Sequence, residues 1–363
     1  MRALAKHKNV IITGPPAVGK SHIMSSVITN FKQAALPARR IAPAADVPIP
    51  RGNRGVPQWL PSPGKRNRNA FQITFHQGTK HRDFISGIAP NLGSKAVGFS
   101  VVSGTLFNAN LHALQHDSTS LVCIDEINRG PAVAIFGDTL TSIEPTKRLG
   151  DDGSPTEFSV PFTAYSPSTN SQDTLFLSSD VYILASMNEA DTSVEPLDVA
   201  FLRRFFIYRI GLDKPELVRY FNLQSSNQEE SQADAADITT IYQLLVDAWQ
   251  QVNEKIAIGK SSAFQIGHGV LMNGAPPQDY DQALTYAVDC WKRIESHVLE
   301  VFFGNEPAIA AVLNAKPGGV YELVEREFAE QEVFRLAIKP WGKEHITDLL
   351  LQVSGRQNAN DNS

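Results

Sequence analysis

Residues 14 to 21 read Gly-Pro-Pro-Ala-Val-Gly-Lys-Ser, and this pattern constrains the fold of the 363-residue chain more than any other. A β-branched run, Val10 to Thr13, precedes it, and apolar residues at helical spacing follow from Ser21 to Phe31. A G-x-x-x-x-G-K-S segment that joins a strand to a helix is typical of a loop that wraps phosphate groups with its backbone N–H groups. The chain is therefore expected to open with half of a βαβ unit and to belong to the α/β class.

Each part of this pattern has a role at a phosphate. Glycines let N–H groups turn inward, and the positive end of the following helix adds its dipole. Lys20 is expected to reach the β- and γ-phosphate oxygens, and the Ser21 hydroxyl to bind Mg²⁺. The predicted nucleotide-binding residues are Gly14, Pro15, Pro16, Ala17, Val18, Gly19, Lys20, Ser21 and His22.

A second pattern supplies the acids that a nucleotide-hydrolysing site needs. The apolar run from Ser120 to Ile124 is typical of a buried parallel strand, and Asp125 and Glu126 follow it directly. Open parallel sheets bind ligands at the carboxyl ends of their strands, so both acids are expected near the phosphates. We predict that Asp125 holds Mg²⁺ together with Ser21 and that Glu126 polarises the attacking water. A solvated acidic pair after a core strand is the alternative.

Three polar residues follow later in the chain. Asn188 ends the apolar run Val181 to Met187, which would place its amide near the γ-phosphate, although Asn more commonly forms turns. Arg203 and Arg204 end a short predicted helix that begins at Pro196. Such a pair suits a finger that reaches the nucleotide of a neighbouring subunit, or else a cationic cap of the helix C-terminus. The predicted catalytic residues are thus Glu126, Asn188, Arg203 and Arg204.

Strand and helix alternate only in the first part of the chain. Besides the segments already named, we expect a strand at Phe71 to Phe75, helices at Ser103 to Gln115 and Ala132 to Ile143, a hairpin formed by Glu157 to Tyr165 and Thr174 to Ser178, and a last strand at Phe205 to Ile210. Later spacing is nearly all helical, at Ile238 to Ile256, Tyr280 to Phe303 and Ile346 to Val353. The prediction is a doubly wound parallel sheet over residues 1–211, a smaller all-helical lid with a helical extension over 212–353, and a tail, 354–363.

Composition limits the cellular context. The chain is 42% apolar, enough for a full α/β core, and no apolar run approaches the roughly twenty residues that cross a bilayer. Cys123 and Cys290 have neither metal-ligand spacing nor a disulfide framework, so we expect a cytoplasmic protein with no membrane contact. The net charge of −5 argues against a protein that coats nucleic acid with its whole surface. His112 and His116 lack a third ligand, which favours a polar helix face over a metal site.

One segment departs from this acidic balance. Residues 36–70 contain seven prolines, a single acid, Asp46, and the cations Arg39, Arg40, Arg51, Arg54, Lys65, Arg66 and Arg68. An extended basic insert is predicted, which could line a central pore and touch DNA phosphates without reading sequence. A solvated, disordered loop is the favoured alternative.

Taken in order, the motifs resemble the AAA+ module of the McrB family. The likeness is carried by the phosphate loop, Ile124-Asp125-Glu126-Ile127-Asn128-Arg129-Gly130, Ile135-Phe136-Gly137, Met187-Asn188-Glu189-Ala190-Asp191 and Leu202-Arg203-Arg204-Phe205. Further matches are Phe75-His76, Asp83-Phe84, Gly87 and Ile266-Gly267-His268, so the resemblance spans about residues 10–304.

The resemblance implies an AAA+ sheet with a helical lid and a hexameric ring that holds nucleotide between subunits. It also implies an McrC-like nuclease partner that stimulates hydrolysis and cuts DNA, which the ring would contact through that partner or through pore loops. By position, the family's roles fall as follows: phosphate and Mg²⁺ on Lys20 and Ser21, Walker B acids on Asp125 and Glu126, sensor on Asn188, trans-acting arginines on Arg203 and Arg204, and acids near the signature loop on Asp191 and Asp198.

Two departures from the family pattern bear on function. Thr192 stands where the family's signature loop has Arg, so the nucleotide stays open as ATP or GTP, with a lean to ATP. The first strand starts at Val10, so the DNA-recognition domain that often precedes this module is expected in a partner or in inserts. Two other functions remain open: a MoxR-like ATPase that remodels protein complexes, and a scaffold that uses nucleotide only to assemble.

Overall fold

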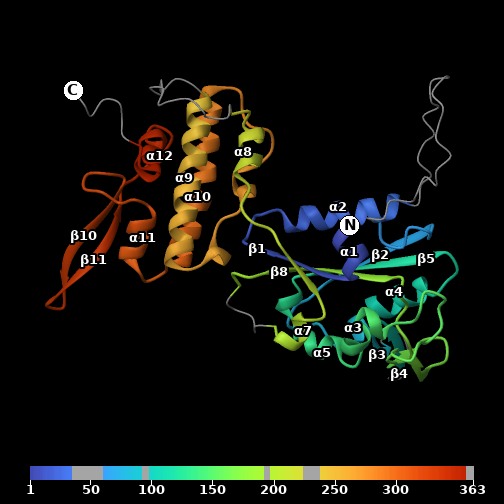
Figure 1. Cartoon of the computed structure of the whole chain (residues 1–363). Helices are drawn as coiled ribbons and strands as arrows, with labels where there is room; N and C mark the ends of the chain where they lie inside the picture. Colours follow the sequence, from blue (N-terminus) through green and yellow to red (C-terminus); the bar gives the residue numbers. More distant parts are fainter. Residues whose placement is uncertain (35–59, 92–97, 192–196, 224–237, 357–363) are drawn as a thin grey trace, which may run out of the picture. The chain divides into compact units, whose positions relative to one another are not determined.

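The computed structural model describes residues 1–34, 60–91, 98–191, 197–223 and 238–356 (Figure 1). The chain divides into two compact units, which we call the sheet unit and the helical unit. The sheet unit comprises Met1–Thr13 and Lys20–Arg209, and the helical unit comprises Gly14–Gly19 and Ile210–Ser363. The loop Gly14–Gly19 therefore groups with the C-terminal part of the chain, although it lies near the N-terminus in sequence.

The sheet unit is built on a five-stranded sheet with the order β2-β5-β8-β1-β9. Its strands are β1 (Asn9–Gly14), β2 (Asn67–Thr74), β5 (Ser118–Asp125), β8 (Val181–Asn188) and β9 (Phe206–Arg209). The pairs β2 with β5, β5 with β8 and β1 with β9 are all parallel. Ser118 to Ile124 and Val181 to Ser186 are buried, as expected for strands covered on both faces. The predicted α/β fold is thus confirmed.

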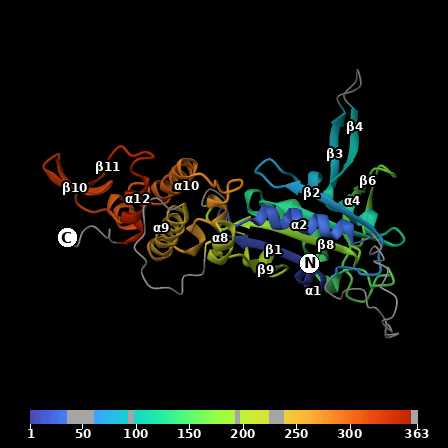
Figure 2. The same ribbon diagram turned by 90° about the horizontal axis from the view of Figure 1, so that it is seen from above.

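Short helices and two hairpins complete the sheet unit. The helices are α1 (Arg2–His7), α2 (Lys20–Gln33), α3 (His81–Phe84), α4 (Thr105–Ala113), α5 (Ala132–Phe136), α6 (Thr139–Ser142) and α7 (Val199–Leu202). The hairpins pair β3 (Ser86–Asn91) with β4 (Gly98–Ser103) and β6 (Phe162–Ser166) with β7 (Ser171–Leu175). In Figure 2 the β3–β4 hairpin projects away from the sheet.

An aromatic cluster packs the short helices together beside the sheet. The Phe136 ring centroid lies 4.7 Å from that of Phe84 and 5.3 Å from that of Phe201, and all three side chains are fully buried. Rings at such distances attract one another beyond their buried area. The single helix predicted at Ala132 to Ile143 is wrong, because the chain leaves α5 at Gly137, whose φ of 51° ends the helix. Strand β2 begins at Asn67, earlier than predicted.

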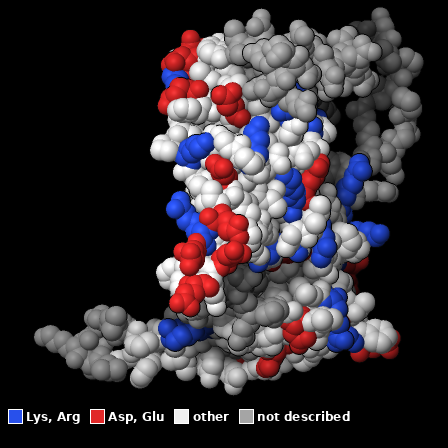
Figure 3. Space-filling view, turned by 90° about the vertical axis from the view of Figure 1, so that its left-hand side faces the viewer, with Lys and Arg blue, Asp and Glu red and all other residues white. Residues whose placement is uncertain are grey.

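The helical unit has two long helices, α9 (Ile238–Gly259) and α10 (Tyr280–Val301), and three shorter ones, α8 (Lys214–Tyr220), α11 (Glu306–Val312) and α12 (Ile346–Ser354). Trp249 and Trp291 are buried in its core. The Trp291 Nε1–H group donates to the Tyr321 hydroxyl at 2.8 Å, so both polar atoms are satisfied inside the core. On the face in Figure 3, acidic and basic side chains lie intermixed, which is typical of an ordinary solvated surface.

The helical unit also contains a hairpin that the sequence did not predict, formed by β10 (Tyr321–Phe328) and β11 (Gln331–Ile338). Its turn residues, Ala329 and Glu330, have φ values of 51° and 60°. Two-residue hairpin turns of this hand are usually marked by Asn or Gly, which is the signal missing here. The C-terminal part is therefore helical with one added hairpin.

Contacts with residues 266–271 hold the loop Gly14–Gly19 within the helical unit. The Gly267 N–H group donates to the Pro16 carbonyl at 2.8 Å, and the Gly269 N–H group donates to the Ala17 carbonyl at 2.9 Å. A Cβ atom at Gly267 would lie 2.1 Å from the Ala17 carbonyl carbon. Since that contact is with backbone, the loop can approach only if residue 267 is glycine.

We therefore predict that Gly267→Ala destabilises the protein by about 1–3 kcal/mol, as overpacking against a fixed neighbour does. The measurement is thermal unfolding of the apo protein. Gly211→Ala is the matched control and should unfold like the wild type, because a Cβ atom there meets nothing within 4 Å. Equal melting temperatures for Gly267→Ala and Gly211→Ala would contradict the conclusion that residue 267 must be glycine for the loop to pack against it.

Candidate nucleotide-binding site

The phosphate loop joins β1 to α2, as its sequence predicted. Strand β1 ends at Gly14 and helix α2 begins at Lys20, so Lys20 and Ser21 stand at the first turn of the helix. The backbone of the loop is left-handed at Ala17, with a φ of 60°, and at Gly19, with a φ of 85°. A turn of this kind lets successive N–H groups face one concavity, as an anion-binding loop requires.

Parallel pairing of β5 with β8 fixes the two acids. Ile124 lies opposite Ala185, so the next residues, Asp125 and Ser186, are neighbours at the carboxyl ends of the strands. The Ser186 hydroxyl donates to the Asp125 carboxylate and accepts from the Glu126 N–H group at 3.0 Å. The Ser186 hydroxyl therefore orients Asp125 through the Asp125 side chain and Glu126 through the Glu126 backbone.

The predicted metal ligands face a common space. Ser21 and Asp125 both line a cavity of about 280 Å³, together with Thr74 and Cys123. Mg²⁺ prefers hard oxygen ligands and usually keeps only one or two protein ligands beside phosphate oxygens, so a hydroxyl and a carboxylate fit it. Among the described residues, no group of three or more His, Cys, Asp or Glu could hold a metal ion. Burial raises the pKa of the Cys123 thiol to about 12, so Cys123 is uncharged.

The charges of Lys20 and the acids act on one another. Burial lowers the pKa of Lys20, while the negative charges of Glu126, Glu189 and Asp125 raise it. Burial likewise raises the pKa of Glu126, and the positive charges of Arg129 and Lys20 lower it. A cation and carboxylates from separate segments thus lie together in a partly desolvated site, where their fields are strong.

Asn188 ends β8, as predicted. Its backbone carbonyl accepts from the Asn128 amide at 3.1 Å, and its own side-chain oxygen accepts from the Ala190 N–H group at 3.3 Å. The Asn128 side-chain oxygen is buried and has no hydrogen-bond partner among the residues that the structure describes. Asn188 thus supports a turn at the strand end in this structure, beside the position expected of a sensor.

The two adjacent arginines differ in their surroundings. The Arg203 side chain is exposed. The Arg204 side chain is only 10% exposed, forms an ion pair with Glu144 at 3.1 Å and donates to the Ala200 carbonyl. Of the two alternatives, the contacts of Arg204 fit a cationic cap of the helix C-terminus, because its guanidinium is engaged within the chain. Asp198 caps α7 by accepting from the Ala200 N–H group.

Two residues near the acids, Arg129 and Ser186, were not among the predicted site residues. Arg129 lies within ion-pair distance of Glu126 and Asp191, at 3.6 Å and 3.1 Å respectively. Its place three residues after Glu126 was a local signal that could have suggested a contact. Ser186 gave no such signal, because its contact with Asp125 depends on strand register.

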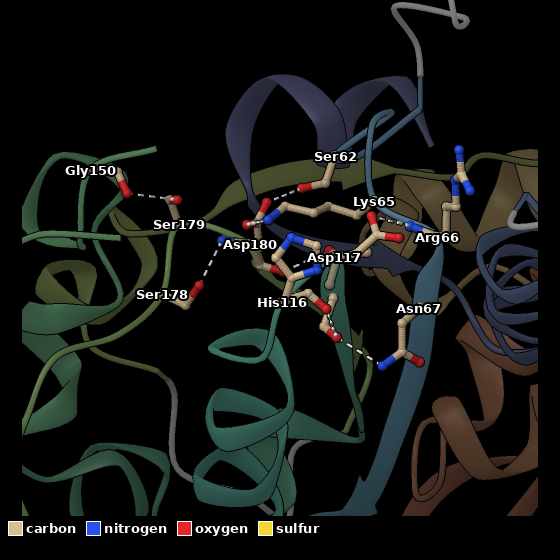
Figure 4. A network of polar contacts seen from close by, with 12 residues as sticks. Ser62, Lys65, Arg66, Asn67, His116, Asp117, Gly150, Ser178, Ser179 and Asp180 are labelled. Atoms are coloured by element: carbon tan, nitrogen blue, oxygen red, sulfur yellow. Dashed lines mark hydrogen bonds and ion pairs between the residues drawn. The ribbon is translucent and has the colours of Figure 1, made fainter. Parts of the chain in front are cut away.

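The part of the basic segment that the structure describes is engaged with the fold. Figure 4 shows Lys65 and the Ser62 hydroxyl directed at Asp180, with a Lys65–Asp180 distance of 3.3 Å. Arg68 is nearly buried in β2, and its guanidinium donates to the carbonyls of Phe31 and Ser62. Arg68 therefore fits neither a loop that touches DNA nor the favoured alternative of a solvated loop. Residues 35–59, and with them the other cations of the insert at Arg39, Arg40, Arg51 and Arg54, lie outside the described residues, as do Thr192 and Pro196.

Comparison with known proteins supports the same family as these motifs. Residues 64–205 match the model of the AAA domain, dynein-related subfamily. The chain is 29% identical over 278 residues to the "Type IV methyl-directed restriction enzyme EcoKMcrB subunit" of Escherichia coli (strain K12), which covers 76% of this chain and 49% of that protein.

A second relative is the "Type II restriction enzyme BsuMI component YdiS" of Bacillus subtilis (strain 168), 32% identical over 120 residues, which cover 32% of this chain and 35% of that protein. The chain thus spans about half, or less, of the length of these relatives. None of the described helices is both long and apolar enough to span a membrane. With the loop, the sheet and the acids arranged as above, these matches show that the chain is similar to McrB-like proteins of the AAA+ class.

Proposed function

We propose that this protein hydrolyses ATP or GTP with Mg²⁺ as the motor subunit of a restriction complex. The observation that carries the proposal is the convergence of Lys20, Ser21, Asp125 and Glu126, which come from α2 and from the end of β5. Bound Mg²⁺ would neutralise phosphate charge that develops during hydrolysis. The restriction role is favoured over protein remodelling or assembly alone because both relatives above are restriction-enzyme components.

Each residue of the site has a part in this reaction. Lys20 binds phosphate oxygens, and Ser21 with Asp125 holds the metal ion. Glu126 accepts a hydrogen bond from the attacking water and orients it. Asn188 lies at the end of the neighbouring strand, where its amide can sense the transferred phosphate. These roles are typical of phosphoryl transfer, in which proteins act chiefly by positioning and by electrostatic stabilisation.

Arg203 completes the site of a neighbouring subunit in our proposal. It ends a short helix, is exposed, and lies next to Arg204, which the fold already uses. We infer a homo-oligomeric ring, with six subunits as in the family that the chain resembles. An McrC-like nuclease subunit would bind the ring and bring it to DNA.

We predict that Glu126→Gln keeps nucleotide affinity and lowers turnover by a factor on the order of 10² to 10⁴, the usual contribution of a general base. Phosphate release gives the turnover, and a fluorescent nucleotide analogue gives the affinity. Lys20→Ala is the contrasting variant and should lose affinity as well. Normal hydrolysis by Glu126→Gln would refute the role given to Glu126.

Arg203→Ala and Arg204→Ala should fail in different ways. Arg203→Ala should leave the melting temperature unchanged and lower turnover by roughly 10³, as loss of an arginine finger does. Arg204→Ala should instead destabilise the fold by about 1–3 kcal/mol, because Glu144 loses its charged partner.

A mixing experiment tests whether Arg203 acts in trans. Arg203→Ala and Glu126→Gln should each be nearly inactive alone, but a mixed ring would contain interfaces with one intact Glu126 and one intact Arg203. Activity of the mixture above that of either variant is expected. An inactive mixture that still forms oligomers would argue against the trans role.

A further inference from the structure

Arg129 lies between two carboxylates of the sheet unit. It ends the 3₁₀ turn Ile127–Arg129, which follows the paired acids directly. Its Nε atom is 3.1 Å from Oδ2 of Asp191 and 3.6 Å from Oε2 of Glu126. Asp191 comes from the segment after β8, so one guanidinium joins the ends of two neighbouring strands.

The backbone of Glu126 is fixed independently of this contact. Its φ of 53° is left-handed, its N–H group donates to Ser186, and its carbonyl accepts from the Arg129 N–H group at 2.9 Å. A non-glycine residue keeps such a conformation only where its surroundings impose it. Only the direction of the Glu126 side chain is therefore left for Arg129 to control.

The two contacts of Arg129 are unequal. At 3.1 Å the contact with Asp191 is within hydrogen-bond range, whereas 3.6 Å to Glu126 is an ion-pair distance without a hydrogen bond. Accordingly, Oε2 of Glu126 is buried and accepts no hydrogen bond from the described residues. A general base needs a carboxylate that is held in place but still accessible, and the Glu126 side chain, held at Oε2 by Arg129, is 27% exposed as a whole.

We propose that Arg129 is a positioning residue for Glu126 and that Asp191 limits how closely the Arg129 guanidinium approaches Glu126. Asp191 takes the closer contact of the guanidinium, which keeps Arg129 from closing fully on Glu126. Loss of Asp191 would let Arg129 close on Oε2 and turn the Glu126 carboxylate away from the direction in which it orients water. This inference rests on the proposed function, because it takes Glu126 as the group that orients the attacking water.

The test asks whether Asp191 affects hydrolysis through Arg129 or independently of it. Asp191→Asn and Arg129→Ala should each lower kcat by about tenfold to a hundredfold, the loss expected from a misplaced catalytic group. KM and the affinity for a fluorescent nucleotide analogue should change less than about twofold, since neither residue binds phosphate. Arg129→Lys keeps the charge and should recover part of the loss.

The double variant Arg129→Ala, Asp191→Asn shows whether the effect of Asp191 depends on Arg129. If Asp191 acts through Arg129, the double variant is no slower than Arg129→Ala alone. Losses that multiply would overturn the proposal, as would a loss confined to nucleotide affinity. Arg219→Ala is a matched control, because Arg219 is exposed and pairs with Glu216 at the same i, i+3 spacing; its kcat should equal that of the wild type.

A second readout does not use hydrolysis. The free energies of unfolding of the single and double variants give a coupling energy for the contact between Arg129, 51% exposed, and Asp191, 14% exposed; a value different from zero is expected. Additive changes in stability would deny the Arg129–Asp191 contact. If Glu126→Gln hydrolyses normally, the proposed function fails; if it is inactive but Asp191→Asn turns over normally, only this inference fails.

Discussion

The register between β5 and β8 is the constraint on which the site depends. Because Ile124 lies opposite Ala185, Ser186 comes next to the acids and hydrogen-bonds to both Asp125 and Glu126. A slip of one residue would turn every side chain of a strand to the opposite face. Both strands are buried on both faces, so their pairing register, and not an alternation of apolar and polar faces, sets the polar geometry at the edge of the sheet.

Residues distant in sequence also fix the conformation of the phosphate loop. It is contiguous with β1 and α2, but its carbonyls at Pro16 and Ala17 accept hydrogen bonds from the segment containing Gly267 and Gly269. The backbone that would surround a phosphate is therefore shaped by residues distant in sequence. A change in the helical unit near Gly267 can reach the loop through main-chain contacts alone.

Local patterns in the sequence predicted the loop, the acids and most elements, because strand-to-helix turns and buried apolar runs follow from short-range preferences. Two of the failures involve partners that are distant in sequence. The sequence does not distinguish Arg203 from Arg204, whereas in the structure only Arg204 forms an ion pair with Glu144. Arg68 was expected in a solvated loop, but its guanidinium is buried and donates to the carbonyls of Phe31 and Ser62. The β10–β11 hairpin was missed because Ala329 and Glu330 carry no turn signal.

The buried thiol of Cys123 has a chemical consequence for the cavity that it shares with Ser21 and Asp125. Oxidants and alkylating agents attack the thiolate form of cysteine. With its pKa raised to about 12, Cys123 stays protonated at any physiological pH. Cys123 can thus line this cavity as a neutral thiol, which adds bulk but no charge beside Ser21 and Asp125.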